Sequence, residues 1–197
     1  MSSLKANFSE LMLRIRQGRS LGHAGFEPIY YLVFAPSEIL EVKRSLPGWQ
    51  AQLQMDGWEV YRFSLAEEIA QIIQAAPTYN IWLRADRKAL QAEQDMRTAW
   101  DKTNQALANA VAGGALQGRL EARLAGLKDV PNALLLVTDL EALHPYLRIG
   151  TIEGQLSGKF CVPTVFLYPG VRTGKTKLSF LGFYPEDGSY RSVHIGG

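Results

Sequence analysis

The sequence predicts an α/β fold whose mainly parallel central sheet is flanked by helices on both faces. Unbroken apolar runs at residues 28–35 and 132–137 are typical of strands that are covered on both sides. Helical segments separate these runs, and this alternation favours parallel strands. Near the C-terminus, two strand-like segments flank Pro185–Gly188 and predict an antiparallel hairpin that makes the sheet mixed.

Length and composition favour one globular domain over residues 1–197. Apolar residues make up 47% of the chain and charged residues 20%, which suffices for a sizeable core. No apolar run approaches the roughly 18 residues that a membrane-spanning helix needs, and a lone cysteine fits a reducing compartment. We therefore expect a cytoplasmic protein that does not enter the membrane.

The first third of the chain predicts helices alternating with strands. An amphipathic helix at about 4–17 is followed by the strand at 28–35. Ser37 is then expected to cap a helix that Leu46–Gly48 interrupts, and a second strand follows at 58–63. The apolar face of the first helix consists of Leu4, Phe8, Leu11, Met12 and Ile15.

The middle of the chain has helical patterns. Ser64 and Glu67 form a capping box at the start of a helix. A long helical stretch is expected over about 86–111, and a shorter helix then runs to about Ala125. Because few large apolar residues occur here, we expect the insertion at about 84–125 to project as a helical hairpin over one sheet face.

The last third contains the remaining predicted strands. Residues 132–137 and 162–168 are two strands of the buried kind, and Pro145 lies near the start of a helix between them. The predicted C-terminal hairpin pairs residues 177–184 with residues 189–195.

Residues 170–176 are similar to a nucleotide-binding loop. Such a loop has four residues between its glycines, whereas three separate Gly170 from Gly174. It also leads into a helix whose N-terminus faces the phosphates, but a strand-like segment follows Lys175–Thr176. We interpret the segment as a basic turn between two strands, and a nucleotide-dependent switch is the alternative.

Residues suited to catalysis or metal binding are scattered. His23, His144, His194 and Cys161 show no metal-binding spacing, and there is no Gly-x-Ser-x-Gly elbow. The apolar neighbours of Cys161 are typical of a buried structural cysteine. Asp139 ends an apolar strand, where we expect its carboxylate to cap the next helix. The sequence therefore predicts no catalytic residue, no metal and no cofactor, and we expect the protein not to be an enzyme.

A denser polar group occurs where two predicted strands end. Ligands of open α/β sheets bind outside the carboxyl ends of the strands, so these residues are a candidate interaction surface. Helix capping and turn formation are the alternative for any single one of them. The candidate residues are Asp139, Glu141, His144, Tyr146, Arg148, Tyr168, Gly170, Arg172 and Lys175.

Two segments are basic, at residues 1–20 and 144–177, although the net charge is only +2. If folding brings them together, they could contact the phosphates of a nucleic acid. A solvated basic rim is the alternative interpretation.

Five segments carry a family resemblance: 29–36 (IYYLVFAP), 58–65 (WEVYRFSL), 140–148 (LEALHPYLR), 162–170 (VPTVFLYPG) and 180–188 (FLGFYPEDG). Their order and spacing resemble BrxB, a family of the bacteriophage-exclusion (BREX) systems of bacteria. The resemblance implies an accessory component of phage defence without catalytic activity of its own. It also implies a PglZ-type partner of the alkaline-phosphatase superfamily. The leading hypothesis is therefore an adaptor, and nucleic-acid contact through the basic segments is the alternative.

Overall fold

The computed structural model describes residues 3–21, 27–91, 96–174, 177–187 and 192–197. The first half contains α1 (Leu4–Leu21), β1 (Ile29–Phe34), η1 (Pro36–Glu38), α2 (Ile39–Met55), β2 (Glu59–Ser64), α3 (Leu65–Ala75) and α4 (Tyr79–Gln91). The second half contains α5 (Met96–Ala112), α6 (Ala115–Leu127), β3 (Ala133–Thr138), η2 (Leu140–Leu143), α7 (Ile149–Gln155), β4 (Thr164–Thr173), β5 (Lys177–Phe180) and β6 (Val193–Gly196).

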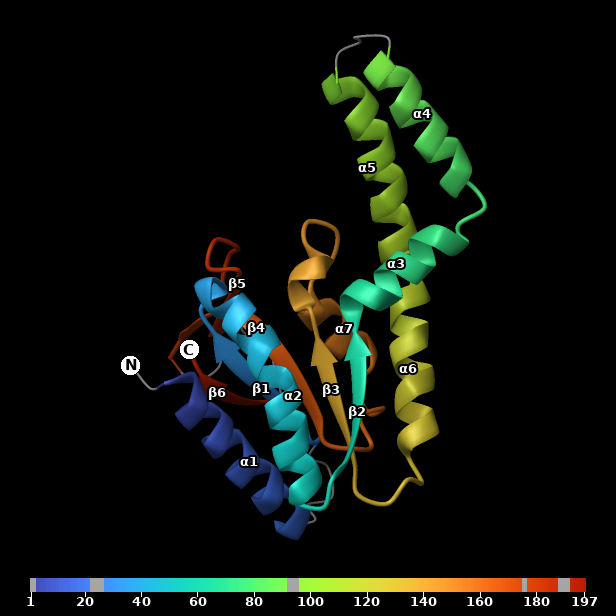
Figure 1. Cartoon of the computed structure of the whole chain (residues 1–197). Helices are drawn as coiled ribbons and strands as arrows, with labels where there is room; N and C mark the ends of the chain where they lie inside the picture. Colours follow the sequence, from blue (N-terminus) through green and yellow to red (C-terminus); the bar gives the residue numbers. More distant parts are fainter. Residues whose placement is uncertain (1–2, 22–26, 92–95, 175–176, 188–191) are drawn as a thin grey trace.

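The strands form one twisted sheet in the order β2-β3-β4-β1-β6 (Figure 1). All neighbours along this path are parallel, and β5 adds an antiparallel strand to the distal end of β4. The predicted α/β class with a mainly parallel, mixed sheet is confirmed.

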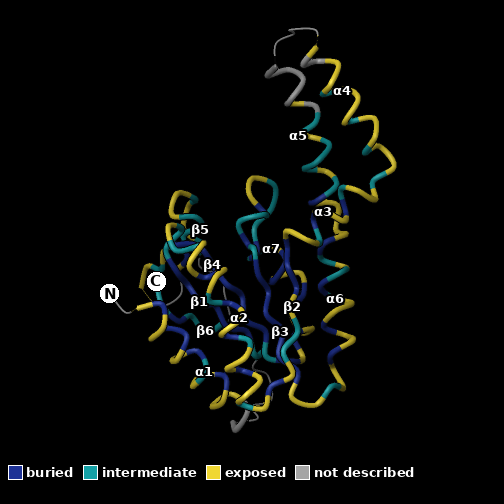
Figure 2. Tube along the Cα trace, in the orientation of Figure 1, coloured by how far each residue is buried: buried dark blue, intermediate teal, exposed yellow. Residues whose placement is uncertain are grey.

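Helices cover both faces of the sheet, as predicted. On one face, α1 and α2 bury an apolar cluster that includes Phe8, Trp49 and Leu53, and the rings of Phe8 and Trp49 stack with centroids 4.6 Å apart. On the other face, α3, α6 and α7 cover a cluster that includes Leu135 and Phe166. The central strands β1 and β3 and the first part of β4 are accordingly buried at every position (Figure 2).

The C-terminal hairpin differs from the prediction. Residues 177–180 pair with β4 rather than with 189–195, and β6 lies beside β1 in parallel register. Pairing of β5 ends where Leu181 and Gly182 take positive φ angles of 54° and 75°. Beyond them, β6 buries Ile195 beneath α1 at the opposite edge of β1, so its partner is set by packing and not by the turn sequence.

The helix after β1 also differs from the prediction. The N-cap of η1 is Ala35, whose N–H donates to Glu38 Oε2 at 2.8 Å. Ser37 lies inside η1 and is therefore not the cap that the sequence predicted. Pro47 does not interrupt α2, which runs unbroken to Met55. Burial of Trp49 and Leu53 on the sheet offsets the backbone hydrogen bond that proline lacks.

The predicted helical insertion divides into two parts with different roles. The expected helix over 86–111 is two helices, α4 and α5, with residues 92–95 outside the described ranges. These two helices pack side by side and extend beyond the sheet (Figure 1). Only α6 lies over the sheet face, where it buries Leu116, Leu120 and Leu124. We call the pair α4 and α5 the arm.

Candidate interaction surface

Polar side chains form a connected network at the carboxyl ends of β2 and β3. Asp139 has a φ angle of 60°, and its Oδ2 accepts hydrogen bonds from Ser64 Oγ at 2.6 Å and Thr138 Oγ1 at 2.8 Å. Lys43 Nζ lies 2.9 Å from Asp139 Oδ1 and 2.7 Å from Glu141 Oε1. The expected cap at Asp139 is therefore wrong, because its carboxylate turns back across the strand ends and makes no hydrogen bond to the η2 backbone.

The electrostatics of this network fit a structural role. Burial raises the pKa of Asp139, but hydrogen bonds from Ser64, Lys43 and Thr138 outweigh burial and hold that pKa below its ordinary value. The hydrogen bond to Glu141 raises the pKa of Lys43. Ser64 also caps α3, as predicted, by accepting from the N–H of Glu67 at 3.3 Å. The other half of the predicted capping box differs, because the Glu67 carboxylate pairs with Arg62 and not with the Ser64 N–H. The network thus joins α2, α3 and two strand ends.

An aromatic cluster lies next to this network. The ring of His144 is edge-on to Phe183 and Tyr184, with centroids 5.5 Å and 5.4 Å away, and its Nδ1 bonds to the Tyr184 hydroxyl. The guanidinium of Arg148 sits 4.0 Å above the Tyr184 ring. Tyr146 reaches towards the arm, with its hydroxyl 3.5 Å from Asn104 Oδ1. Phe183 is 65% exposed, which makes this cluster accessible to a partner.

The other candidate residues do not join the exposed surface. Tyr168 is 1% exposed and Gly170 is buried, so a partner cannot touch either residue. The reason is that β4 continues past Pro169, whose carbonyl accepts from Leu181 N at 2.9 Å, and β5 then covers it. Arg172 donates to the His194 carbonyl at 2.7 Å, and Lys175 lies outside the described residues.

The segment that resembles a nucleotide-binding loop lies between two strands, and its residues 175–176 are outside the described ranges. Gly170 lies within β4, and β5 begins at Lys177, so a strand and not a helix follows Gly174. The predicted strand after the segment is confirmed, but residues 170–173 belong to β4 and not to the turn. Among the described residues of this segment, none begins a helix whose N-terminus could face a phosphate.

The basic segments 1–20 and 144–177 would have to present free charges together to form a phosphate-binding patch. Several of their charges are already paired. Arg14 pairs with Glu10 and Arg16 with Asp56 in the first segment. Lys159 and Lys177 pair with Glu121 and Glu186 in the second. This arrangement gives little support to a shared phosphate-binding patch.

Cys161 is exposed, contrary to the prediction that it is buried, and its thiol lies 3.3 Å from the Leu124 carbonyl. Its side chain alternates with the buried Phe160 and Val162, so it points away from the core. Among the described residues, no three His, Cys, Asp or Glu side chains gather as metal ligands. Within the same residues, each helix is too short or too polar to cross a bilayer.

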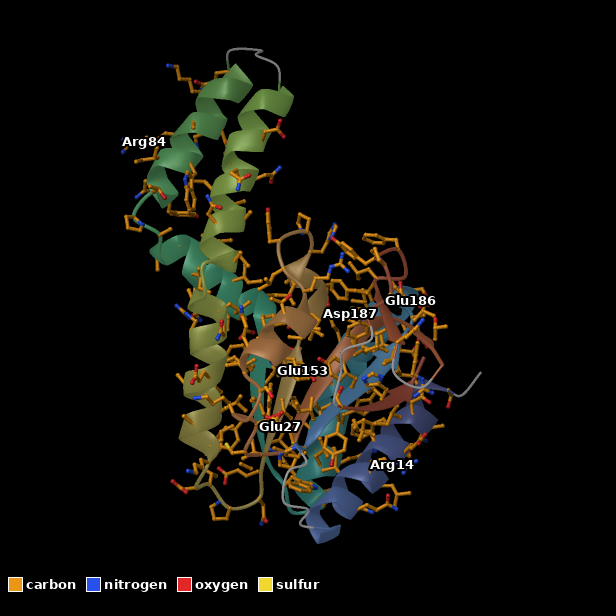
Figure 3. All side chains as sticks on the ribbon, turned by 180° about the vertical axis from the view of Figure 1, so that it is seen from behind. Arg14, Glu27, Arg84, Glu153, Glu186 and Asp187 are labelled. Carbon is orange, nitrogen blue, oxygen red and sulfur yellow. The ribbon has the colours of Figure 1, made fainter. Side chains whose placement is uncertain are left out.

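A buried polar contact that sequence reasoning missed lies beneath α7. Glu153 is 7% exposed and accepts a hydrogen bond from the Tyr31 hydroxyl; Figure 3 labels this glutamate over the sheet. The ring of His194 on β6 is edge-on to Tyr31 at 5.4 Å. Burial and the positive charge of Arg172 lower the pKa of His194 to about 4. His194 lies against Tyr31 because β6 pairs in parallel with β1. The predicted hairpin paired this strand with residues 177–184 instead, so sequence reasoning did not bring the two residues together.

Stability should therefore depend on the protonation of His194. Its pKa is about 4 in the folded protein and 6.5 in a model peptide, so the unfolded chain binds more protons between these values and stability falls as pH falls through this window. Because His194 is only partly buried, we expect the wild type to lose about 1–2 kcal/mol more than His194→Gln between neutral pH and about pH 4. Urea denaturation across this range measures the difference. Parallel pH curves for the two proteins would contradict the assignment.

The arm presents a second surface that sequence reasoning left undefined. Ile81 is 62% exposed and Leu83 38% exposed on α4. Thr103 of α5 donates to Asp86 Oδ1 at 2.7 Å, which fixes the inner side of α4. Figure 3 shows Arg84 pointing away from α5. At helical spacing, the exposed residues form one outer face of α4, consisting of Ile81, Leu83, Arg84, Arg87 and Lys88.

Comparison with known proteins identifies the family of this chain. A family model described as "BREX protein BrxB" matches residues 65–195, which include the arm and, from the strand-end network, Asp139 and Glu141 but not Lys43 or Ser64. No match was found among the curated proteins or the solved structures. Because the match extends over more than half of the chain, from α3 to β6, this protein belongs to the BrxB family of BREX proteins.

Proposed function

We propose that this protein is a non-catalytic adaptor of a BREX phage-defence system and acts by docking onto a PglZ-type protein. Family membership supports a role as a BREX component. The observation that carries the docking role is the arm, which projects beyond the sheet and has an exposed outer face on α4 (Figure 1).

The chemistry of the outer face suits an interface. Ile81 and Leu83 flank the cations Arg84, Arg87 and Lys88 around the helix. Burying an exposed aliphatic side chain at an interface contributes up to about 1.5–3 kcal/mol to the free energy of binding. Large apolar residues exposed next to polar ones mark interaction sites. The matching surface on the partner would be acidic at its centre, with apolar residues on either side.

The aromatic cluster adds a second contact region at the base of the arm. Phe183 is exposed and Arg148 is partly exposed; aromatic residues and arginine are the types that interfaces favour. Tyr146 lies between this region and α5. The carboxylates of Asp139 and Glu141 are engaged by Lys43, so this region offers contacts rather than an acid–base pair. In the proposed docking, the partner contacts both the outer face of α4 and the aromatic cluster.

Co-expression with the neighbouring PglZ-type protein, followed by size-exclusion chromatography, tests the proposal. We expect the two chains to elute as one species at physiological salt. A chain that elutes alone after co-expression with each BREX component in turn would contradict the adaptor role.

A further inference from the structure

A groove runs along the free edge of the sheet, between β2 and α6. Its volume is about 550 Å³, within the range of ligand sites in proteins. One wall is the edge strand β2 at Tyr61–Phe63, and the other is α6. The residues of α6 that line it are Arg119, Ala122, Arg123, Gly126 and Leu127.

The β2 wall presents main-chain groups to the groove. Glu59 N–H donates to Asn132 O at 2.9 Å. The main-chain N–H and C=O groups of Glu59, and of every second residue after it, therefore point towards β3. Val60 and Arg62 therefore direct their N–H and C=O groups away from β3. Within the described part of the chain, β2 is the last strand of the sheet and no segment pairs with that outer edge. An open strand edge is a template for another strand.

The α6 wall is shaped and charged for an occupant. The small residues Gly126 and Ala122 leave space between α6 and β2, and a Cβ built at Gly126 meets no atom within 4 Å. Arg119 bonds to Glu68 at 2.7 Å, whereas Arg123 lies 5.3 Å from the centre of the Tyr61 ring. Among the described residues, no carboxylate lies within ion-pairing distance of Arg123. The lining is thus positively charged overall.

We propose that the groove between β2 and α6 binds an extended, acidic peptide segment of a partner protein by strand addition to β2. Main-chain hydrogen bonds to Val60 and Arg62 hold the segment, as in other peptide-binding sheet edges. Alternate side chains of the segment then face α6, where small residues pack against Ala122 and Gly126 and a carboxylate pairs with Arg123. This surface is distinct from the arm, so it serves a second contact.

A displayed library of random peptides of about eight residues, the length of a typical strand, tests the proposal. It is selected on the immobilised full chain. We expect enriched peptides to be acidic, free of proline and rich in β-branched residues at alternate positions. Amide exchange at Val60 and Arg62 should slow when such a peptide binds, because their N–H groups become hydrogen-bonded.

Two glycines of α6 provide a blocking variant and its matched control. Gly126→Leu fills the groove with a side chain that meets no protein atom at its Cβ, so the fold is retained and binding should fall at least about tenfold. Gly118→Leu makes the same change on the same helix outside the groove and should bind like the wild type. Arg123→Gln should also weaken binding and reduce its salt dependence.

Several outcomes would overturn the proposal. One is a library with no enrichment over the bare support. Another is enriched peptides that bind Gly126→Leu as well as Gly118→Leu, which would place binding elsewhere. A third is a groove that instead takes a short single-stranded oligonucleotide, with the affinity lost in Gly126→Leu, because the occupant would then be a nucleic acid. Failure of docking through the arm would leave all of these readouts unaffected.

Discussion

Replacing Phe166 with alanine should lower the free energy of unfolding by about 4 kcal/mol. Phe166 lies in β4 with 0% exposure, between β1 and β3. Its ring stacks on Tyr31 at 5.0 Å and is edge-on to Phe160 at 6.1 Å. Because strands on both sides fix the backbone, the cavity left by the ring cannot collapse. Urea denaturation followed by circular dichroism measures the loss, with an unchanged m value.

Phe183→Ala is the matched control for this prediction. Phe183 is 65% exposed, so its replacement should change the free energy of unfolding by no more than about 0.5 kcal/mol. A loss for Phe166→Ala as small as that of Phe183→Ala would show that the core does not lie between α7 and the central strands.

Gly170→Ala should destabilise the protein by about 3 kcal/mol, because β5 passes too close for any side chain. A Cβ at this position would lie 2.4 Å from the Ser179 carbonyl oxygen and 2.5 Å from the Tyr168 ring. Since the carbonyl belongs to the paired strand, the strain can be relieved only by separating β4 from β5. Thermal unfolding of the variant measures the effect.

Gly118→Ala tests whether loss of a glycine matters by itself. This helical position faces open space, so alanine should stabilise α6 by up to about 1 kcal/mol. The two variants should therefore shift the melting temperature in opposite directions. A stable Gly170→Ala protein would mean that β5 does not pack on β4 as described.

The sequence predicted the sheet well because its strands are buried on both faces. Residues 29–34 and 133–138 are buried at every position, and that burial produces continuous apolar runs. The partners of the C-terminal strands were not predictable in this way. An alternating segment shows which side is apolar but not which strand it joins, so β6 was assigned to β5 instead of β1.

The candidate surface was predicted in part for a similar reason. Asp139, Glu141, His144 and Arg148 do lie together at the strand ends, as the topology rule for open sheets indicates. Tyr168 was wrongly assigned to this surface because the strand was predicted to end there. In the structure β4 continues to Thr173, and Tyr168 is buried. The outer face of α4 and the groove beside β2 depend on how helices pack, which local patterns do not specify.

Affinity measurements on arm variants test the central claim most directly. Ile81→Asp places a charge on the outer face of α4, whereas Leu40→Asp makes the same kind of change at an exposed leucine of α2. Docking through the arm predicts that Ile81→Asp weakens binding to the PglZ-type protein at least about tenfold. It predicts wild-type affinity for Leu40→Asp. Equal affinities for the two variants, or weaker binding by Leu40→Asp alone, would contradict the account.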